Sequence, residues 1–262
     1  MKIYVLVENT THKEDVLTEH GLSMYIETAK HKILFDTGCG TAFAENAKIM
    51  GVDLSAVDVC IISHGHSDHG GGLAKFMELN KTAPIYISKL GFERYFAADG
   101  REIGLDKELM KSGRFILTDR GVQIDEELEL LSCNGLERSH KFSSFGLFKQ
   151  VEGELIADDF LHEQYLLVKE NGKLILFSGC SHKGVLNLMT WLKPDVLVGG
   201  FHFMKLATDG ADKAVLDDAV EFLNKQPAKY YTCHCTGIEQ YEYLKERMPK
   251  LEYAASGDII EL

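Results

Sequence analysis

Four side chains that commonly bind metal ions fall within six consecutive residues of this chain. The sequence SHGHSDHGGG over 63–72 spaces them as His-x-His-x-Asp-His: His64, His66, Asp68 and His69. The apolar, β-branched run over 57–62 predicts a buried strand, and residues 73–79 predict a helix. Because the backbone can curl where a strand ends in a loop, all four side chains can converge on one point there. A regular strand or helix would separate them.

The chemistry of these four side chains favours a metal site. Imidazole suits zinc and similar ions, and the carboxylate adds negative charge. The alternative interpretation is a polar loop whose histidines face solvent. So dense a group of ligands between a strand and a helix argues against that alternative.

Composition excludes several kinds of partner. The formal net charge of −12 argues against a nucleic-acid surface, which needs a basic face. A small anionic substrate stays compatible, since bound divalent cations reverse the local potential. We expect no membrane partner, because no apolar run approaches spanning length and residues 1–7 are too short for a signal peptide. The six cysteines contain no Cys-x-x-Cys pair, which predicts free thiols and a cytoplasmic location. The oligomeric state is left open.

Two parts of the chain repeat one pattern. Hairpins are predicted over 24–38 and 165–179, each ending at a glycine, and the sequences ILFDTGC and LILFSGC occupy equivalent positions in them. The next predicted strands end near His66 and His202. An internal duplication implies two similar sheets packed face to face with helices outside, although chance similarity is the alternative. Helices are also predicted over 42–50, 185–192, 214–224 and 238–247, so the fold class is α/β.

The middle of the chain is less regular. Strands are predicted over 115–117 and 128–131, and the rest of 91–150 alternates between charged, glycine-containing and short apolar stretches. We expect a lid or substrate-binding insert at about 91–150 within a single domain spanning 1–262.

Two further histidines are candidates to complete the site. A catalytic metal takes about three protein ligands, so four clustered ligands are too many for one ion and too few for two. His182 and His234 each follow a predicted strand, so both are candidate ligands. For His182 the alternative is a loop histidine that only forms hydrogen bonds. If the strand over 230–235 stays regular, Cys233 and Cys235 point away from the face of His234 and serve packing. A soft-metal Cys-His-Cys site is the alternative.

Other polar residues receive lesser roles. His202 is expected to contact substrate or to hold a ligand by a hydrogen bond. Asp36, at a strand end, is expected to accept a hydrogen bond from a ligand imidazole, with a simple turn residue as the alternative. For His140 and His162 we expect exposure to solvent. Lys183 and Lys205 are candidates to hold a substrate anion, although solvated surface lysines are the preferred interpretation.

The motifs LFDTG over 34–38 and His-x-His-x-Asp-His resemble the metallo-β-lactamase superfamily. GCSHKG over 179–184, GGFH over 199–202 and HCTG over 234–237 are similar to its dihydropterin-methyl-ribofuranosylaminobenzene-phosphate-synthase-like branch. The resemblance implies a four-layer αββα sandwich, made from two similar halves, with the metals at one edge between the sheets. It suggests one metal on His64, His66 and His182 and a second on Asp68, His69 and His234.

The chain departs from the superfamily pattern at one position. Many members carry an aspartate after the second hairpin that bridges both metals, and residues 178–182 contain none. A negative charge is therefore missing from the expected site. Oxygen-reducing relatives usually carry glutamate where this chain has His66, so redox chemistry is disfavoured.

These observations predict a hydrolase with two divalent metal ions. Zinc is the first candidate, with manganese, iron or magnesium as alternatives. The metal pair would lower the pKa of a bridging water and polarise the phosphoryl or carbonyl oxygen of an anionic ester or phosphoester. Asp68 would accept a proton. The resemblance raises an alternative, a synthase or transferase that joins a dihydropterin diphosphate to a phosphorylated ribofuranosyl aminobenzene. A non-catalytic, metal-dependent ligand-binding protein is a third hypothesis.

Overall fold

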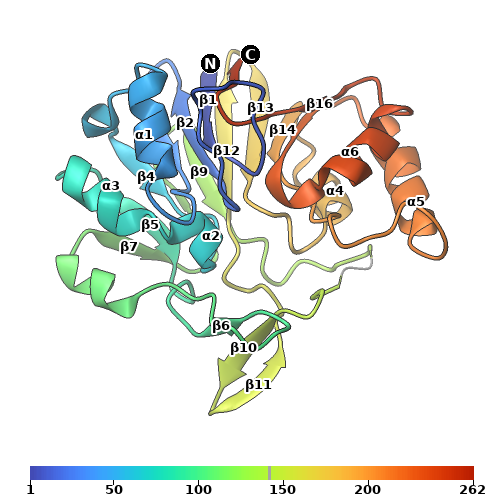
Figure 1. The fold of residues 1–262 in the computed structure, drawn as a ribbon, viewed down its shortest axis with the longest axis horizontal. Coiled ribbons are helices and arrows are strands. Elements are labelled where there is room, and N and C mark those ends of the chain that lie inside the picture. Colours follow the sequence, from blue (N-terminus) through green and yellow to red (C-terminus); the bar gives the residue numbers. More distant parts are fainter. Residues whose placement is uncertain (141–142) are drawn as a thin grey trace.

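Two seven-stranded β-sheets lie face to face in the middle of the molecule, with helices outside them (Figure 1). The computed structural model describes residues 1–140 and 143–262. The helices beside the first sheet are α1 (Ala42–Ile49) and α3 (Leu73–Leu79), and those beside the second sheet are α4 (Val185–Leu192), α5 (Lys213–Asn224) and α6 (Ile238–Lys245). The predicted αββα sandwich is confirmed.

The two sheets have the same topology. In spatial order the first contains β17 (Ile259–Glu261), β1 (Lys2–Val7), β2 (Ser23–Glu27), β3 (Lys32–Phe35), β4 (Val59–Ile61), β5 (Ile85–Ser88) and β7 (Phe115–Thr118). The second contains β8 (Gly121–Gln123), β9 (Leu128–Leu131), β12 (Tyr165–Glu170), β13 (Lys173–Ser178), β14 (Val196–Gly199), β15 (Lys229–Thr232) and β16 (Leu251–Tyr253). In each sheet the first three pairings are antiparallel and the last three are parallel. The predicted similarity of the halves therefore extends over six strands of each sheet, whereas β17, at the edge of the first sheet, comes from the C-terminal end of the chain.

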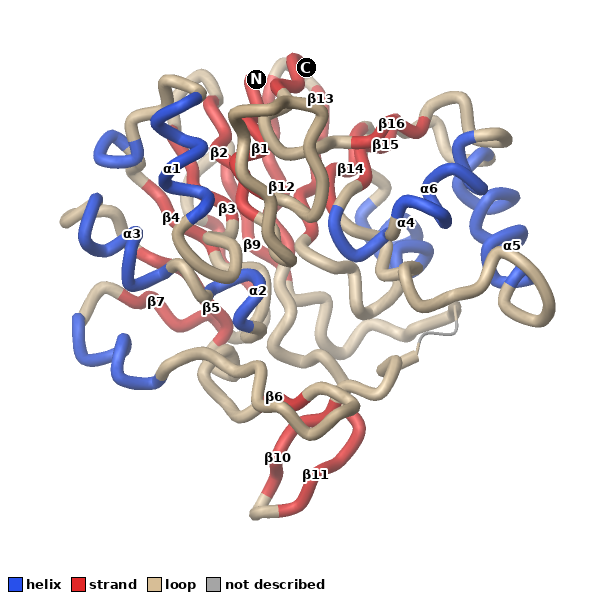
Figure 2. Tube along the Cα trace, viewed as in Figure 1, coloured by secondary structure: helices blue, strands red, loops and turns tan. Residues whose placement is uncertain are grey.

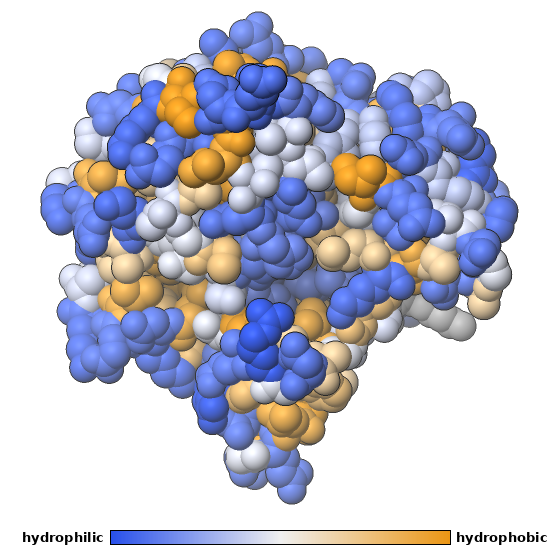
Figure 3. All heavy atoms as spheres, viewed as in Figure 1, coloured by the Kyte–Doolittle hydropathy of each residue, from blue (hydrophilic) through white to orange (hydrophobic). Residues whose placement is uncertain are grey.

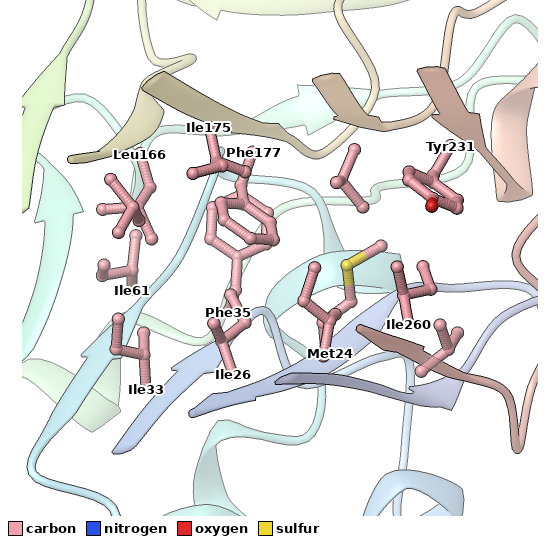
Figure 4. Packing of buried hydrophobic residues seen from close by; sticks show 14 of the residues in the cluster. Met24, Ile26, Ile33, Phe35, Ile61, Leu166, Ile175, Phe177, Tyr231 and Ile260 are labelled. Atoms are coloured by element: carbon pink, nitrogen blue, oxygen red, sulfur yellow. The ribbon is translucent and has the colours of Figure 1, made fainter. Parts of the chain in front are cut away.

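Apolar side chains from both sheets fill the space between them. Phe35 and Phe177 meet across this space with ring centroids 6.0 Å apart (Figure 4). Ile33 and Ile175 lie in the same buried cluster, one from each sheet. Burying a side chain of this size contributes about 1.5–3 kcal/mol. This core holds the two sheets, and the loops at their ends, at a fixed separation.

The helices pack by amphipathic faces. In α5 the buried residues are Leu216, Ala219, Val220 and Leu223, which share one face of a helix. Together with the apolar residues of α4 they cover the outer face of the second sheet. In the described part of the chain, no helix is both long enough and apolar enough to cross a bilayer.

Much of the expected insert belongs to the two central sheets. The predicted strands over 115–117 and 128–131 are present as β7 and β9, and the chain passes from one sheet to the other between β7 and β8. Separately, β6 (Tyr95–Phe96), β10 (Phe148–Val151) and β11 (Glu154–Ala157) form a small sheet. Its β10–β11 hairpin projects from the molecule and carries exposed apolar side chains (Figures 1 and 3). The 3₁₀ helices η1 (Leu54–Ala56) and η2 (Lys107–Ser112) lie in other connections.

Loops collect at one edge of the sandwich. Because β3, β4 and β5 are parallel, as are β13, β14 and β15, their carboxyl ends meet at the same edge of each sheet. Figure 2 shows these connecting loops gathered between the two sheets and the small third sheet. The candidate ligands lie in them.

Candidate metal centre

The segment after β4 forms a tight turn followed by α2 (Ser67–Gly70), a single helical turn. We expected a loop without a helix here, so α2 refines that prediction. A Cβ atom added at Gly71 would lie 2.2 Å from Cys39 O, and one at Gly72 would lie 2.3 Å from Thr37 O. Glycine is required at both positions, because the segment packs directly against the turn after β3. This packing places all four ligand candidates at the edge of the first sheet.

Three histidines from both halves of the chain form one group. The Nε2 atoms of His64 and His182 lie 3.3 Å apart, and one ring nitrogen of His66 lies within 4.8 Å of each. With metal–nitrogen bonds of about 2.0–2.1 Å, two ligands of a tetrahedral ion lie about 3.4 Å apart. All three side chains are buried. Their spacing fits one shared ion.

The other three candidate ligands lie beside this group. Asp68 Oδ2 is 3.4 Å from His234 Nε2 and 3.8 Å from His69 Nε2. The His69 and His234 side chains are fully buried, and that of Asp68 is 22% exposed. His20 also approaches, with Nε2 at 3.5 Å from Asp68 Oδ2, although its side chain is largely exposed. The structure therefore brings together all six residues from the sequence prediction.

Hydrogen bonds set the tautomer of three of these histidines. Asp36 Oδ2 accepts from Nδ1 of His69 at 2.7 Å, as expected for Asp36. Ser63 donates its one hydroxyl hydrogen to Asp36, so Nδ1 of His64, at 2.8 Å, must donate to Ser63 Oγ. In each case Nε2 is the ring nitrogen left on the side of the cluster, where it can bind a metal once it carries no proton.

His234 is held in the same way by Asn9, which follows β1 near the N-terminal end of the sequence. Its Nδ1 donates to Asn9 Oδ1 at 2.8 Å, and its buried Nε2 has no hydrogen-bond partner among the described residues. Sequence reasoning missed Asn9, although it follows β1, whose carboxyl end lies at the edge of the site.

His162 contradicts the expectation of solvent exposure. Its side chain is buried, its Nδ1 accepts from the backbone N–H of Gly65 at 2.9 Å, and its Nε2 lies 3.1 Å from Asp158 Oδ2. Asp158 Oδ2 is also 3.6 Å from His66 Nε2, so this buried carboxylate lies beside two histidines of the site. Polar neighbours in the sequence suggested exposure, but the loop before β12 folds inward onto the turn at Gly65. His140 is half-buried and packs against Phe222.

The regular strand on which the prediction for Cys233 and Cys235 depended is not present. Strand β15 ends at Thr232, and His234 begins the 3₁₀ turn η3 (His234–Thr236) with a φ of 49°. The alternation of a regular strand is therefore lost. Cys233 packs in the central core, whereas Cys235 lines the metal cavity. Its thiol and that of Cys180 both lie within 4.8 Å of a ring nitrogen of His234.

Backbone strain is concentrated at this edge. Asp36, Ser181, His202 and His234 all have φ between 49° and 60°, a region that residues other than glycine seldom adopt. Such conformations are retained where the surrounding structure imposes them, and they cluster at functional sites. Each of the four follows a strand and turns its side chain toward the site or the residues around it.

Lys183 is neither a surface residue nor an anion site. Its side chain is fully buried, and its Nζ donates to the carbonyl oxygens of Ser132 and Glu163, both at 2.7 Å. Burial lowers the pKa of Lys183 to about 8, although Glu163 opposes this shift. The Glu163 carboxylate accepts from the backbone N–H groups of His182 and Lys183 at 2.8 and 3.1 Å. Lys183 and Glu163 thus fix the loop that carries His182.

Two cavities meet at His182 and His202. A cavity of 340 Å³ is lined by four of the six ligand candidates, and it is bordered by the exposed cations Arg101 and Lys205. A second cavity, of 310 Å³, is lined mostly by apolar side chains, including Phe145 and Phe203. His202 lies between them, and neither of its ring nitrogens has a hydrogen-bond partner among the described residues. Its position fits the expected contact with substrate.

The protonation states suit metal binding. Burial, reinforced by the neighbouring imidazoles, holds the pKa values of His64 and His182 well below the ordinary value, so both are neutral. Burial alone would lower the pKa of His69, but the Asp68 and Asp36 carboxylates outweigh it and raise the pKa to about 9. Binding a cation at His69 therefore displaces a proton from Nε2. Neutral imidazoles with free lone pairs fit divalent metal ions.

Comparisons with known proteins agree with this geometry. Residues 18–140 match the family model described as Metallo-beta-lactamase superfamily. The chain is 29% identical over 291 residues to 7,8-dihydropterin-6-methyl-4-(beta-D-ribofuranosyl)-aminobenzene-5'-phosphate synthase of Methanocaldococcus jannaschii, covering 100% of this chain and 96% of the relative. It is 27% identical over 268 residues to an uncharacterized protein of the same organism, covering 98% and 99%.

One solved structure is similar over its full length. A metal-dependent hydrolase of the beta-lactamase superfamily superimposes with a TM-score of 0.83 at 26% identity, covering 100% of this chain and 99% of that one. The sequence similarity, the fold and the geometry of the candidate ligands all agree with the resemblance to metal-binding members of the metallo-β-lactamase superfamily.

Proposed function

Because residues 18–140 match the model of the metallo-β-lactamase superfamily, we propose that the chain is a metal-dependent hydrolase of that superfamily, acting on small anionic esters or phosphoesters. The observation that carries this proposal is the convergence of six ligand side chains from both halves of the chain on one cluster, four of which line a single cavity. The structural relative with a TM-score of 0.83 is named as a hydrolase, which supports the reaction class.

Two divalent ions fit the cluster. His64, His66 and His182 would hold one, and Asp68, His69 and His234 the other. Zinc is the first candidate, since imidazole ligands predominate, with manganese, iron and magnesium as alternatives. When bound, such ions activate water and polarise a phosphoryl or carbonyl oxygen.

The protein's own side chains divide the remaining tasks. Asp68 Oδ2 faces the cavity and can take a proton from attacking water. His202 is half-buried, and its two ring nitrogens, which have no partner among the described residues, can donate a hydrogen bond to a substrate oxygen. Arg101 and Lys205 at the cavity border favour a substrate that carries an anionic group.

The test is hydrolysis of a panel of phosphoesters and carboxylic esters by protein purified without chelator. We expect turnover that is lost on chelation and recovered with zinc or manganese. His66→Ala should lose both turnover and bound metal while remaining folded, whereas His140→Ala, outside the cavity, should keep both. Unchanged activity of His66→Ala would refute the proposal.

A second candidate is a synthase reaction. The apolar cavity beside the metal cavity can hold an aromatic group, and a full-length relative is a synthase of a pterin-linked aminobenzene phosphate. An aryl amine nitrogen would form a C–N bond to a dihydropterin methylene carbon, while the bond from that carbon to pyrophosphate oxygen breaks. Pyrophosphate release that requires the aryl amine would identify this reaction. Release with water alone would identify hydrolysis.

Absence of turnover in both assays, with metal bound, would leave the third hypothesis, a non-catalytic ligand-binding protein. Isothermal titration of the metal-loaded protein with inorganic phosphate and pyrophosphate would then measure the affinity of the cavity for anions.

A further inference from the structure

One buried thiol lies where the two ligand groups meet. Cys180 Sγ is 3.2 Å from Nε2 of His69, and it lies within 4.8 Å of a ring nitrogen of His64. The same sulfur lies within 4.8 Å of ring nitrogens of His182 and His234, so it adjoins ligands of both proposed ions. Only 3% of Cys180 is exposed. The surrounding nitrogens include buried atoms with no partner among the described residues, such as Nε2 of His234.

We infer that Cys180 is a seventh metal ligand and that its thiolate is shared by the two ions. This inference rests on the metal centre proposed above. On binding, the S–H bond is lost as the metal–sulfur bonds form, and the proton passes to solvent. Residues 178–182 contain no aspartate, and the thiolate sulfur of Cys180 then supplies the negative charge that an aspartate would give.

The observed distances fit a shared ion. With metal–sulfur and metal–nitrogen bonds of about 2.3 and 2.0–2.1 Å, two such ligands of one tetrahedral ion lie about 3.5 Å apart. The observed Cys180–His69 separation of 3.2 Å is close to this value. A Cβ atom at Gly179 would lie 2.3 Å from Ser63 Oγ, so the backbone before Cys180 is pressed against the ligand loop of the first sheet. Cys180 is positioned by the contact between the two sheets.

Cys235 has a different relation to the cluster. Its thiol points toward the backbone carbonyl of Cys180, with Sγ at 3.5 Å from that oxygen. It also packs on Gly200, where an added Cβ would lie 2.3 Å from the sulfur. Cys235 Sγ also lies within 4.8 Å of a ring nitrogen of His234, but because this sulfur is engaged with the Cys180 carbonyl and packed on Gly200, we assign the metal bond to Cys180.

A shared thiolate has a consequence for metal choice. Sulfur favours zinc, cobalt or iron over magnesium, which prefers oxygen ligands. The chain should therefore select a soft or borderline ion even in a large excess of magnesium.

The test uses the full-length protein loaded with cobalt(II), whose bond to a thiolate gives an intense near-ultraviolet charge-transfer band. We expect two cobalt ions per chain and this band in the wild type. Cys180→Ser should lose the band and bind fewer than two cobalt ions, whereas Cys133→Ser, at a half-buried position outside the cavity, should resemble the wild type. Cys180→Asp should again bind two ions, without the band and with greater affinity for magnesium or manganese.

Several outcomes separate this inference from the proposed function. Two bound ions and metal-dependent turnover without the band in the wild type would overturn the thiolate ligand alone. Loss of the band in Cys235→Ser but not in Cys180→Ser would show that Cys235 binds the metal in place of Cys180. That result would also overturn the inference. Absence of any bound metal would overturn the proposed function itself. If Cys180→Ser fails to fold, as judged by circular dichroism, the spectra of the wild type and of Cys235→Ser still decide the outcome.

Discussion

The Nε2 atoms of His64 and His182 lie 3.3 Å apart, although 118 residues separate them in the sequence. His64 follows β4 of the first sheet, and His182 follows β13 of the second. Two imidazole lone pairs at this distance repel each other unless a proton or a cation lies between them. Burial keeps both side chains neutral, so one ring can still donate an Nε2–H to the other, and a bound metal ion would replace that hydrogen bond by accepting a lone pair from each ring.

Replacing His182 by alanine should remove one ligand from this pair. We expect bound metal to fall below two ions per chain and kcat to fall by about 100-fold or more. Metal analysis after gel filtration and steady-state kinetics would measure both. A fully metal-loaded, active His182→Ala protein would contradict the assignment. His140→Ala is the matched control, because His140 lies outside the metal cavity.

Asp36→Asn should weaken metal binding without disturbing the turn. Asparagine tolerates the left-handed φ of 60° at this position and can still accept from Ser63 N–H through its amide oxygen. It lacks the carboxylate that fixes Nδ1–H of His69. We expect metal affinity to fall about 10–100-fold, measured by competition with a chelating dye, and a thermal midpoint close to that of the wild type. Unchanged affinity would show that Asp36 does not orient His69.

Lys205→Met should affect binding more than turnover. Lys205 borders the metal cavity and is exposed, so its ammonium group attracts an anionic substrate without contacting the metal ligands. We expect KM for a phosphorylated substrate, and the Ki of inorganic phosphate, to rise about 5–10-fold with kcat nearly unchanged. Lys81→Met, which is exposed but lies away from the cavity, should leave both values unchanged. An equal fall in kcat would contradict this role.

The buried Lys183 should make stability depend on pH. Its folded pKa of about 8 lies below its ordinary value of 10.5, so between these values the unfolded chain binds more protons than the folded one. This group therefore makes the free energy of unfolding rise with pH from about 8 to 10.5. Urea unfolding across this range should show a steeper rise for the wild type than for Lys183→Met, whereas exposed Lys225→Met should parallel the wild type. Parallel curves for Lys183→Met would contradict the lowered pKa.

Phe177→Ala should destabilise the contact between the sheets. The ring is fully buried and meets Phe35 across the core, so truncation leaves a cavity that two rigid sheets cannot close. We expect a loss of about 3–5 kcal/mol in the free energy of unfolding by urea. Leu155→Ala, on the projecting hairpin where the side chain is 49% exposed, should change it by no more than about 0.5 kcal/mol. A similar small change for Phe177→Ala would argue against a continuous core.

Local patterns in the sequence predicted most strands and helices of the central sandwich and the similarity of its halves, but not β6, β8, β10, β11 or β16. Hydrophobic periodicity and glycine turns act over a few residues, which is why the predicted strand over 128–131 and helix over 185–192 agree with β9 and α4. The six ligand candidates were also identified from spacing and from their positions after strands. Parallel strands bring such positions to one edge, so their convergence followed from the α/β class.

The partners of those ligands were decided by tertiary structure. Asn9 meets His234 across 225 residues, and Asp158 meets His66 from the loop before β12. Lys183 and His162 have polar neighbours in the sequence, yet both are buried. Burial of a loop residue depends on which distant segment packs over the loop, and local sequence does not show this. The direction of the Cys235 thiol depended on a strand ending after Thr232, where the turn at His234 meets the end of β1. Local sequence carries the chemistry of each side chain, but only the packing of the two sheets sets which side chains meet.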